Sequence, residues 1–158
     1  MYMRECVRCV ATTKSGERCK RRTCVRKDYC FQHLRIDKKL ELKPSGVPGG
    51  GRGLFTLERK KKGEFIADYT GRVVPRGGEQ PYGLYWNRQK VLDANSTQDA
   101  VGRYANTCRK LNKDRGQCSG NNAKFARDYR SSTAKLRATK TIQPREEVFA
   151  SYGLGYRV

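Results

Sequence analysis

The sequence predicts a mainly β protein built from small antiparallel sheets, with a small zinc-stabilised module at its N-terminus. Short apolar runs of strand length, separated by turn residues, fill residues 49–158. Five of the seven cysteines and the only histidine lie within residues 1–36, which favours a metal-binding module. Residues 44–50 hold two Pro and three Gly, so we expect residues 37–48 to be a linker between the two parts.

The bulk composition indicates a soluble intracellular protein with a polyanionic partner. The 158 residues suit one compact domain with a small appendage. The net charge is +20, from 35 Lys and Arg against 15 Asp and Glu, so DNA, RNA or a nucleosome is an expected partner. No apolar run approaches the roughly 18 residues of a membrane span, and no signal peptide is visible. Seven cysteines without a secretory signal favour metal ligands over disulfides.

Two short pairs in the N-terminal module have the spacing of metal ligands. Cys6 and Cys9 form a C-x2-C pair, and Cys30 and His33 form a C-x2-H pair. A two-residue spacer lets a tight turn aim both side chains at one ion, and structural zinc takes four Cys or His ligands. Spacing alone therefore favours these four residues. A module this small has little apolar core, so the metal would supply much of its stability.

A longer pattern in the same module indicates a different set of four. Cys9-Val10-Ala11-Thr12-Thr13-Lys14-Ser15-Gly16-Glu17-Arg18-Cys19 is followed by Tyr29-Cys30-Phe31-Gln32-His33. This order resembles a small zinc module of viral and microbial proteins, with the pattern C-x-A-x-T-x-x-G-x-x-C and then Y-C-x-x-H. The resemblance implies the zinc ligands Cys9, Cys19, Cys30 and His33, and we prefer this set because the intervening turn matches too. Cys6 and Cys24 are then spare, or they help to bind a second ion.

The rest of the chain is expected to form short strands joined by turns. The glycine turn 49–53 leads into a strand at 54–57, and it lacks the continuation and the helix of a dinucleotide-binding fingerprint. Residues 97–105 are expected as a short helix with Thr97 as its N-cap. Further strands are expected at 64–71, 72–75, 82–86, 90–94, 134–138 and 147–151, with 82–86 and 90–94 forming a hairpin.

Six short motifs in this region occur in a recognisable order. Gly51-Arg52-Gly53-Leu54-Phe55 comes first, Arg103-Tyr104-Ala105-Asn106-Thr107-Cys108 comes later, and Glu146-Glu147 leads to Tyr152-Gly153. This order resembles the SET-domain protein-lysine methyltransferases, which have G-x-G, then R-F-x-N-H-S/C, then G-E-E and a terminal Tyr. The other three similar segments are Ala67-Asp68-Tyr69-Thr70-Gly71, Val91-Leu92-Asp93-Ala94 and Asn121-Asn122-Ala123-Lys124-Phe125.

The resemblance implies a fold of small antiparallel sheets around a knot-like crossing. It also implies that S-adenosylmethionine and a lysine peptide enter from opposite faces. Tyr152 and Tyr69 would be the catalytic residues, with Tyr152 at the methyl-transfer point and Tyr69 lining the lysine channel. Cofactor binding would fall to Gly51, Arg52, Gly53, Leu54, Arg103, Tyr104, Asn106, Thr107 and Tyr156.

The sequence departs from the family pattern at several positions. Thr107 replaces the motif His, so one cofactor contact is altered, and Ala150 stands where many members have Phe or Tyr. No zinc-rich segment follows the domain, so Tyr156, a second copy of the chain in a homodimer, or the N-terminal module must cover the cofactor. Cys108 and Cys118 lack partners for a metal site, and we interpret them as buried thiols.

These observations favour a protein-lysine N-methyltransferase that uses S-adenosylmethionine and carries a structural zinc. A histone lysine is the expected substrate, because the basic surface suits a nucleosome or nucleic acid. The expected location is intracellular, in the nucleus, and in the host nucleus for a viral protein, which the compact zinc-plus-SET arrangement resembles. The alternative is a catalytically weak or inactive SET-like protein that binds nucleosomes or nucleic acid.

Overall fold

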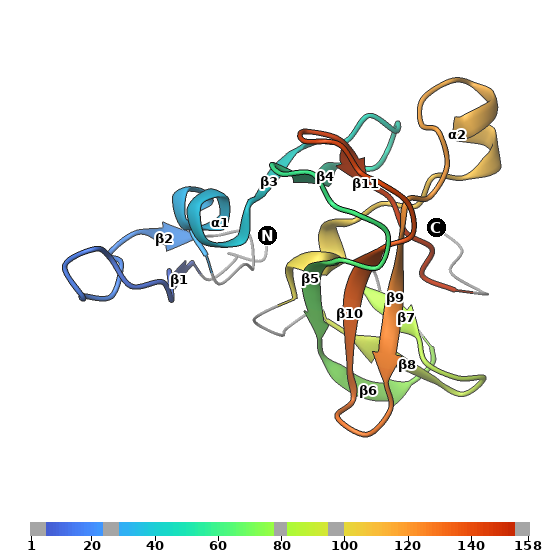
Figure 1. Cartoon of the computed structure of the whole chain (residues 1–158). Helices are drawn as coiled ribbons and strands as arrows, with labels where there is room; N and C mark the ends of the chain where they lie inside the picture. The colour runs from blue at the N-terminus through green and yellow to red at the C-terminus, as the bar shows by residue number, and fades with distance from the viewer. Residues whose placement is uncertain (1–5, 24–28, 78–81, 95–99, 154–158) are drawn as a thin grey trace.

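The computed structural model describes residues 6–23, 29–77, 82–94 and 100–153. In these residues the chain is mainly β, as expected, and its strands form several small antiparallel sheets (Figure 1). One sheet lies in the N-terminal module, and three lie in the larger part of the chain. No helix among the described residues is long and apolar enough to cross a membrane.

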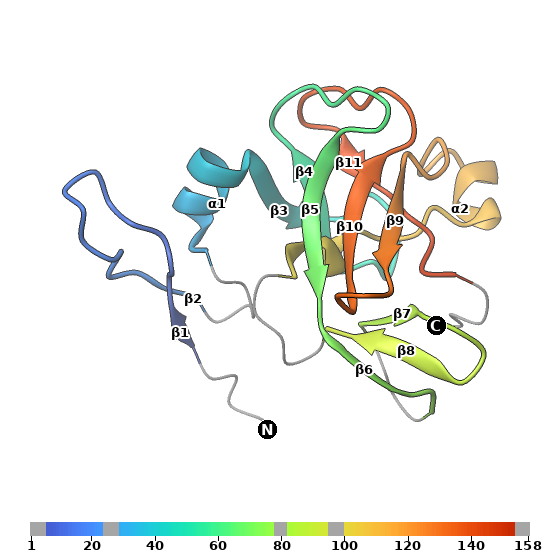
Figure 2. The ribbon, with the colours of Figure 1, turned by 60° about the horizontal axis from the view of Figure 1, so that its bottom comes forward.

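The N-terminal module is a hairpin followed by one helix. Strands β1 (Val7–Arg8) and β2 (Arg22–Thr23) pair antiparallel, and α1 (Phe31–Lys38) follows. The module has its own small core of buried side chains, separate from the main core: Cys9, Ala11, Cys19 and Cys30. It projects to one side of the larger part in both ribbon views (Figures 1 and 2).

The segment expected as a linker contains a strand. Helix α1 ends at Lys38. Its C-cap, Lys39, adopts a left-handed conformation with φ of 54°, and β3 (Leu40–Pro44) begins directly after it. This strand pairs with β4 (Arg52–Thr56), with Leu42 opposite Leu54, and β11 (Glu147–Val148) completes the sheet. The short Leu-Glu-Leu alternation carries this strand, because Leu40 is buried in the main core while Glu41 is partly exposed.

Two further three-stranded sheets enclose the core. One has the order β5 (Phe65–Thr70), β10 (Thr133–Ala138), β9 (Ala123–Asp128). The other has the order β6 (Arg72–Pro75), β8 (Lys90–Asp93), β7 (Gly83–Tyr85), and its β7–β8 hairpin was expected from the sequence.

Two distant chain segments cross in the middle of the larger part. The short 3-10 turn η1 (Val101–Tyr104) leads to Asn106, which forms a parallel bridge with Phe149. Ala123 forms a second parallel bridge with Ala150, so the chain before β9 and the chain after β11 lie side by side. Of the helix expected at 97–105, only this turn forms within the described residues, and 95–99 lies outside them.

The connection after the crossing differs from expectation in two ways. It contains a short helix, α2 (Lys110–Asp114), which was not predicted. Cys108 and Cys118 were expected to be thiols, but they form a disulfide with their Cα atoms 6.0 Å apart. Composition gave no sign of this pairing, because it depends on the turn around α2 that folds the two residues together.

Candidate functional site

The hydroxyl of Tyr152 lies among several backbone carbonyls at the crossing. Tyr152 is only 4% exposed. Its hydroxyl donates to the carbonyl oxygens of Ala105 at 2.7 Å and Arg103 at 2.9 Å, and the Gly102 carbonyl oxygen lies at 3.5 Å. One hydroxyl proton serves several acceptors here, so the site is rich in oxygen lone pairs. Such a site would stabilise a methyl group that carries partial positive charge.

We call the three backbone carbonyls around the Tyr152 hydroxyl the carbonyl ring. Three aromatic side chains form a wall beside it. The Tyr152 ring centre lies 5.0 Å from that of Phe125 on β9 and 6.2 Å from that of Tyr69 on β5. Tyr69 and Phe125 also meet edge to face, at 5.2 Å. Tyr69 is fully buried, and its hydroxyl donates to the backbone carbonyl of Tyr82. The three rings give the site an apolar wall with π faces that can attract an alkylammonium ion.

A buried carboxylate lies behind the glycine turn that precedes β4. Glu147 is 7% exposed, and its two carboxylate oxygens accept hydrogen bonds from the Ser45 hydroxyl at 2.6 Å and the Gly46 N–H at 2.9 Å. A Cβ atom on Gly53 would lie only 2.3 Å from the same carboxylate. Glycine at 53 therefore lets Glu147 fasten the 45–46 loop against β4.

Asn106 connects this carboxylate to the crossing. Its side-chain amide donates to the Arg52 carbonyl at 3.1 Å and contacts the Glu147 carboxylate at 3.4 Å. The next residue, Thr107, donates its hydroxyl to the Ala150 carbonyl at 2.8 Å. The structure thus gathers Arg52, Gly53, Asn106 and Thr107, four residues predicted to bind the cofactor, around one crossing.

The remaining predicted cofactor residues occupy different environments. Leu54 is fully buried in the core, so only its backbone can face a ligand, while Gly51 is exposed with φ of 58°. Arg103 is buried and donates to the Ala94 carbonyl at 2.8 Å, with its guanidinium over the Tyr104 ring at 5.3 Å. Burial raises the pKa of Tyr104, although the charge of Arg103 opposes the shift. Tyr156 lies outside the described residues.

Sequence reasoning missed several residues that build this site. Glu147 stood within a quoted motif, but nothing in the sequence showed which of the paired glutamates turns inward. Phe125 and Asn122 stood in another motif. The side-chain amide of the buried Asn122 donates to the Glu147 backbone carbonyl and accepts a hydrogen bond from the Phe149 N–H, at 2.9 Å each. Ser45 lay in the predicted linker, where no pattern signalled a contact with a residue about a hundred positions away.

A second cluster lies in the N-terminal module. The potential ligand atoms of Cys9, Cys19, Cys30 and His33 all lie within 4.8 Å of one another. Cys30 Sγ and Cys9 Sγ are 3.4 Å and 3.6 Å from Nδ1 of His33. Zinc bonds of about 2.0–2.3 Å in a tetrahedron place ligand atoms roughly 3.5 Å apart, so these donors fit that ion. Cys6 is disulfide-bonded and takes no part, and Cys24 lies outside the described residues.

The cysteines of this cluster differ in how readily they ionise. Burial raises the pKa of the Cys9 thiol. Burial also opposes ionisation of Cys30, but hydrogen bonds from the backbone and ring of His33 prevail and lower the pKa of Cys30 to about 7. A thiolate at neutral pH is the form that binds metal, so Cys30 is prepared for this role.

Comparisons with known proteins agree with the geometry of the crossing. The sequence model of the SET domain matches residues 51–153. Among solved structures, a similar chain is described as "ctPRC2 in an autoinhibited conformation bound to S-adenosylmethionine", with 25% identity and a TM-score of 0.55. The match covers 73% of this chain but only 15% of that one. No curated protein matches.

Proposed function

Because this chain belongs to the SET-domain family, whose members are S-adenosylmethionine-dependent protein-lysine methyltransferases, we propose that it methylates a histone lysine. The observation that carries the proposal is the Tyr152 hydroxyl set among the carbonyls of Gly102, Arg103 and Ala105. S-adenosylmethionine would supply an electrophilic methyl group on a positively charged sulfur. The rest of the chemistry is positioning, which the chain's own residues provide.

The carbonyl ring and the aromatic wall would orient the two reactants. Carbonyl oxygens and the Tyr152 hydroxyl oxygen can accept weak C–H hydrogen bonds from a methyl group that becomes more positive during transfer. Phe125 and Tyr69 would keep water from the amine and favour its cationic product. The lysine nitrogen must arrive as the neutral amine, because its lone pair forms the new N–C bond while the C–S bond breaks.

Gly51, the first residues of β4 and the crossing segment form the proposed cofactor-binding surface. Gly51, Arg52 and Gly53 would present backbone groups to the methionine part, since a side chain at position 53 would collide with Glu147. The hydrogen bond from Asn106 to the Arg52 carbonyl fixes the turn against the crossing. Arg103 and Tyr104 would act mainly by supporting this surface, because both side chains are buried beneath it.

In the N-terminal module we propose a structural zinc held by Cys9, Cys19, Cys30 and His33. The support is the convergence of their ligand atoms in a module whose separate core consists of three of those cysteines and Ala11. We further propose that the basic surface brings the enzyme to nucleosomes or other nucleic acid in the nucleus, which is the host nucleus for a viral chain.

The deciding experiment combines cofactor titration with a transfer assay on the full chain. Calorimetric titration with S-adenosylmethionine should give saturable binding, and core histones or nucleosomes should gain methyl groups that mass spectrometry locates on lysine. Cofactor binding with transfer only to non-histone proteins would refute the histone substrate. If the chain neither binds the cofactor nor transfers methyl groups, the assignment as a methyltransferase is refuted.

A second candidate is an inactive SET-like protein that binds nucleosomes. Thr107 in place of the motif His favours it, since the Thr107 hydroxyl is engaged with the Ala150 carbonyl rather than offered to a cofactor. Saturable nucleosome binding without saturable cofactor binding would support this alternative.

A further inference from the structure

We propose that the hairpin of the N-terminal module, residues 8–22, binds the phosphodiester backbone of duplex DNA. This stretch contains six cations, Arg8, Lys14, Arg18, Lys20, Arg21 and Arg22, and one acid, Glu17. All six cationic residues are exposed. The choice of DNA as the polyanion rests on the proposed histone substrate, because nucleosomal DNA lies beside histone tails.

Two arginines in the hairpin hold each other in place through the backbone. Arg8 donates from Nε and Nη2 to the carbonyls of Cys19 and Arg18, at 2.9 Å and 2.8 Å. Arg18 forms the reciprocal pair of hydrogen bonds: it donates from Nε and Nη2 to the carbonyls of Cys9 and Arg8, both at 3.0 Å. Each guanidinium has five N–H donors, so each retains three beyond these bonds. Two fixed guanidinium groups suit phosphate oxygens, and little side-chain entropy remains to be lost on binding.

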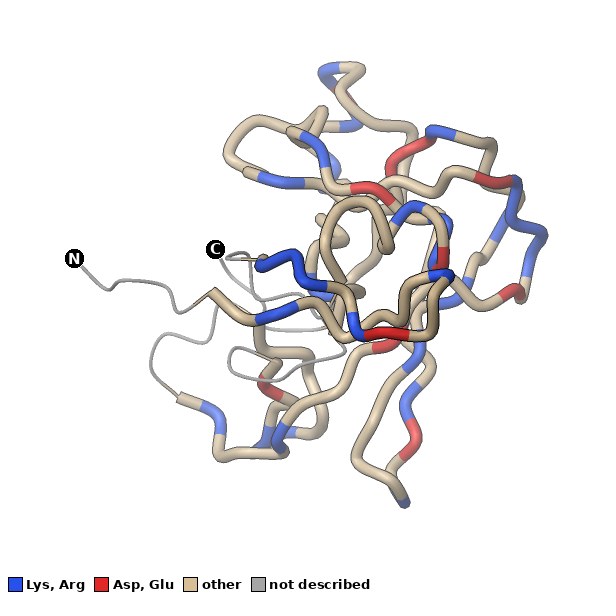
Figure 3. The backbone as a smooth tube through the Cα atoms, turned by 90° about the vertical axis from the view of Figure 1, so that its left-hand side faces the viewer, with Lys and Arg blue, Asp and Glu red and all other residues tan. Residues whose placement is uncertain are grey.

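None of these six cations forms an ion pair within the described residues. The ion pairs found among the described residues join Arg35 with Glu41 and Lys60 with Glu58, and neither involves the hairpin. Figure 3 faces this end of the molecule and shows Lys and Arg spread along the hairpin. The six cations outnumber the one carboxylate of the hairpin, so they repel one another, and a polyanion would relieve that repulsion.

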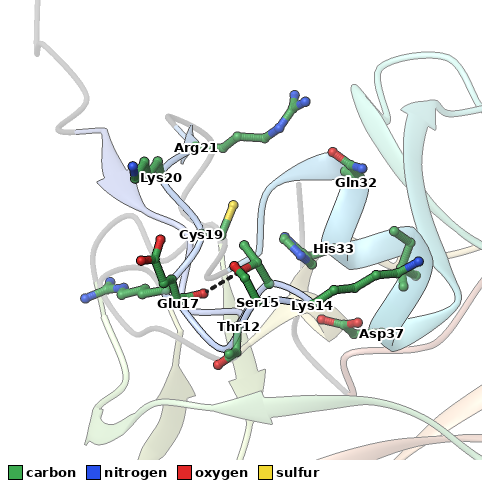
Figure 4. Close-up of a pocket in the computed structure, with 13 residues that line it drawn as sticks. Thr12, Lys14, Ser15, Glu17, Cys19, Lys20, Arg21, Gln32, His33 and Asp37 are labelled. Atoms are coloured by element: carbon green, nitrogen blue, oxygen red, sulfur yellow. Dashed lines mark hydrogen bonds between the residues drawn. The ribbon is translucent and has the colours of Figure 1, made fainter.

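A groove of about 500 Å³ separates the hairpin from α1 (Figure 4). Its lining includes the cations Lys14, Arg18, Lys20 and Arg21 and the acids Glu17 and Asp37, a balance of four positive against two negative charges. In Figure 4, Lys20 and Arg21 extend outward at one edge, while Lys14 reaches toward α1. The phosphates would therefore lie along this cationic edge and not beside Asp37.

The composition of the hairpin favours duplex DNA over a single strand. Residues 8–22 contain no aromatic side chain, whereas proteins that bind single strands stack bases on aromatic rings. Backbone contacts by Arg and Lys position a protein on a duplex without reading its sequence. The expected binding is therefore salt-sensitive and independent of sequence.

The location of the hairpin adds a role in substrate selection. A chain with a net charge of +20 repels a free histone tail, which is itself basic. Nucleosomal DNA would screen that repulsion when the hairpin engages it, since DNA phosphates are negatively charged. The hairpin belongs to the module that projects to one side of the larger part of the chain (Figure 2).

The test compares two triple charge reversals in the full chain. Lys14→Glu, Lys20→Glu and Arg21→Glu spare the Arg8–Arg18 arrangement. Lys61→Glu, Lys62→Glu and Lys140→Glu change the net charge equally at exposed positions in the turn after β4 and the loop after β10. Zinc content and circular dichroism check that both variants remain folded. Fluorescence anisotropy with a labelled DNA duplex of arbitrary sequence measures Kd over a range of salt concentrations.

We expect the hairpin variant to weaken DNA binding at least about tenfold more than the control variant. It should also reduce the slope of log K against log salt by about 3, one unit for each lost phosphate contact. Equal loss in both variants would show that total charge alone binds DNA and would overturn the proposal. Tighter binding to duplex RNA or to polyglutamate than to DNA would overturn it as well. Histone methylation is measured in a separate assay. If the methyltransferase assignment fails, the DNA-binding result can still be interpreted.

Discussion

The carboxylate of Glu147 occupies the space that a side chain at Gly53 would need. A Cβ atom on Gly53 would lie 2.3 Å from Oε1 and 2.8 Å from the carboxylate carbon of Glu147. The carboxylate cannot easily move, because it is buried and accepts hydrogen bonds from Ser45 and Gly46. Position 53 is thus restricted to glycine by a residue from the other end of the domain.

This relationship predicts a compensating pair of substitutions. Gly53→Ala should displace the Glu147 carboxylate and cost about 1–3 kcal/mol of unfolding free energy, as expected when buried hydrogen-bond partners separate. Glu147→Ala removes the obstacle, so the two changes together should cost less than their sum. Thermal unfolding of both single variants and the double variant measures this coupling, and strictly additive effects would contradict the predicted contact.

Replacing Tyr152 by Phe should damage catalysis more than folding. The change removes the hydroxyl that donates to the Arg103 and Ala105 carbonyls at the crossing. Loss of one preorganised polar group at a reacting centre commonly lowers turnover about 100-fold or more. The cost in stability should be about 1–3 kcal/mol.

A matched control for this change is Tyr129→Phe. Tyr129 is 64% exposed, and its ring centre lies 4.7 Å from that of Trp86 in a tilted contact. Removal of the Tyr129 hydroxyl should leave the rate of methyl transfer unchanged. Steady-state turnover and cofactor affinity are measured for both variants, and a Tyr152→Phe enzyme with full turnover would remove Tyr152 from the methyl-transfer point.

The sequence predicted the strands far better than the contacts between distant segments. The β7–β8 hairpin and β10 follow local alternation of apolar residues, which is visible in the sequence. The strand β3 was hidden because Pro and Gly nearby gave the signal of a linker. Nothing local distinguishes a free Leu-Glu-Leu segment from one that pairs with β4, since the partner strand supplies the hydrogen bonds.

The candidate site shows the same division between local and distant information. Motif order placed Gly53, Asn106 and Tyr152 together, and the structure brings them to one crossing. The inward turn of Glu147 and the contact with Ser45 depend on the three-dimensional register of β11 with β4, which no sequence period encodes. The choice of Cys19 over Cys6 as a metal ligand likewise needed more than pair spacing.

Removal of the Cys108–Cys118 disulfide should lower stability. The bridge closes a short loop, with a sequence separation of 10, and such a loop contributes about 3 kcal/mol by chain-entropy arguments. Cys108 also packs against Val47 and Phe149 beside the 45–46 loop. A Cys108→Ser and Cys118→Ser double variant should therefore unfold at a lower temperature than the oxidised parent protein.

A reducing agent distinguishes the stability contributed by the disulfide from the stability contributed by the packing of Cys108. The difference in Tm between the parent protein and the double variant should shrink when a reducing agent is added, because only the parent has this bridge to lose. Alkylation followed by mass spectrometry identifies the thiols. A parent protein in which both cysteines alkylate without reductant would show that they are thiols after all.

Substitution of a metal ligand should unfold the N-terminal module selectively. Cys19→Ser and His33→Ala each remove one of four convergent donors, and each should release about one zinc per chain, because structural zinc requires all four ligands. The module's separate core is small, so its helix should lose hydrogen-exchange protection. The control Thr12→Ala changes an exposed residue of the same hairpin and should retain the metal. Full zinc retention in both ligand variants would refute the assignment.

Nucleosomes should be better substrates than free histone tails, and added salt should raise the KM for nucleosomes but not the KM for free tails. Added salt weakens phosphate contacts, so the KM for nucleosomes should rise steeply with salt concentration. For a free basic peptide, salt instead screens repulsion from a chain with a net charge of +20, so its KM should fall or stay level. The Lys14→Glu, Lys20→Glu and Arg21→Glu variant should lose most of the nucleosome preference while its kcat on peptide remains near that of the parent. If salt changes the KM for both substrates equally, the basic hairpin does not determine the preference for nucleosomes.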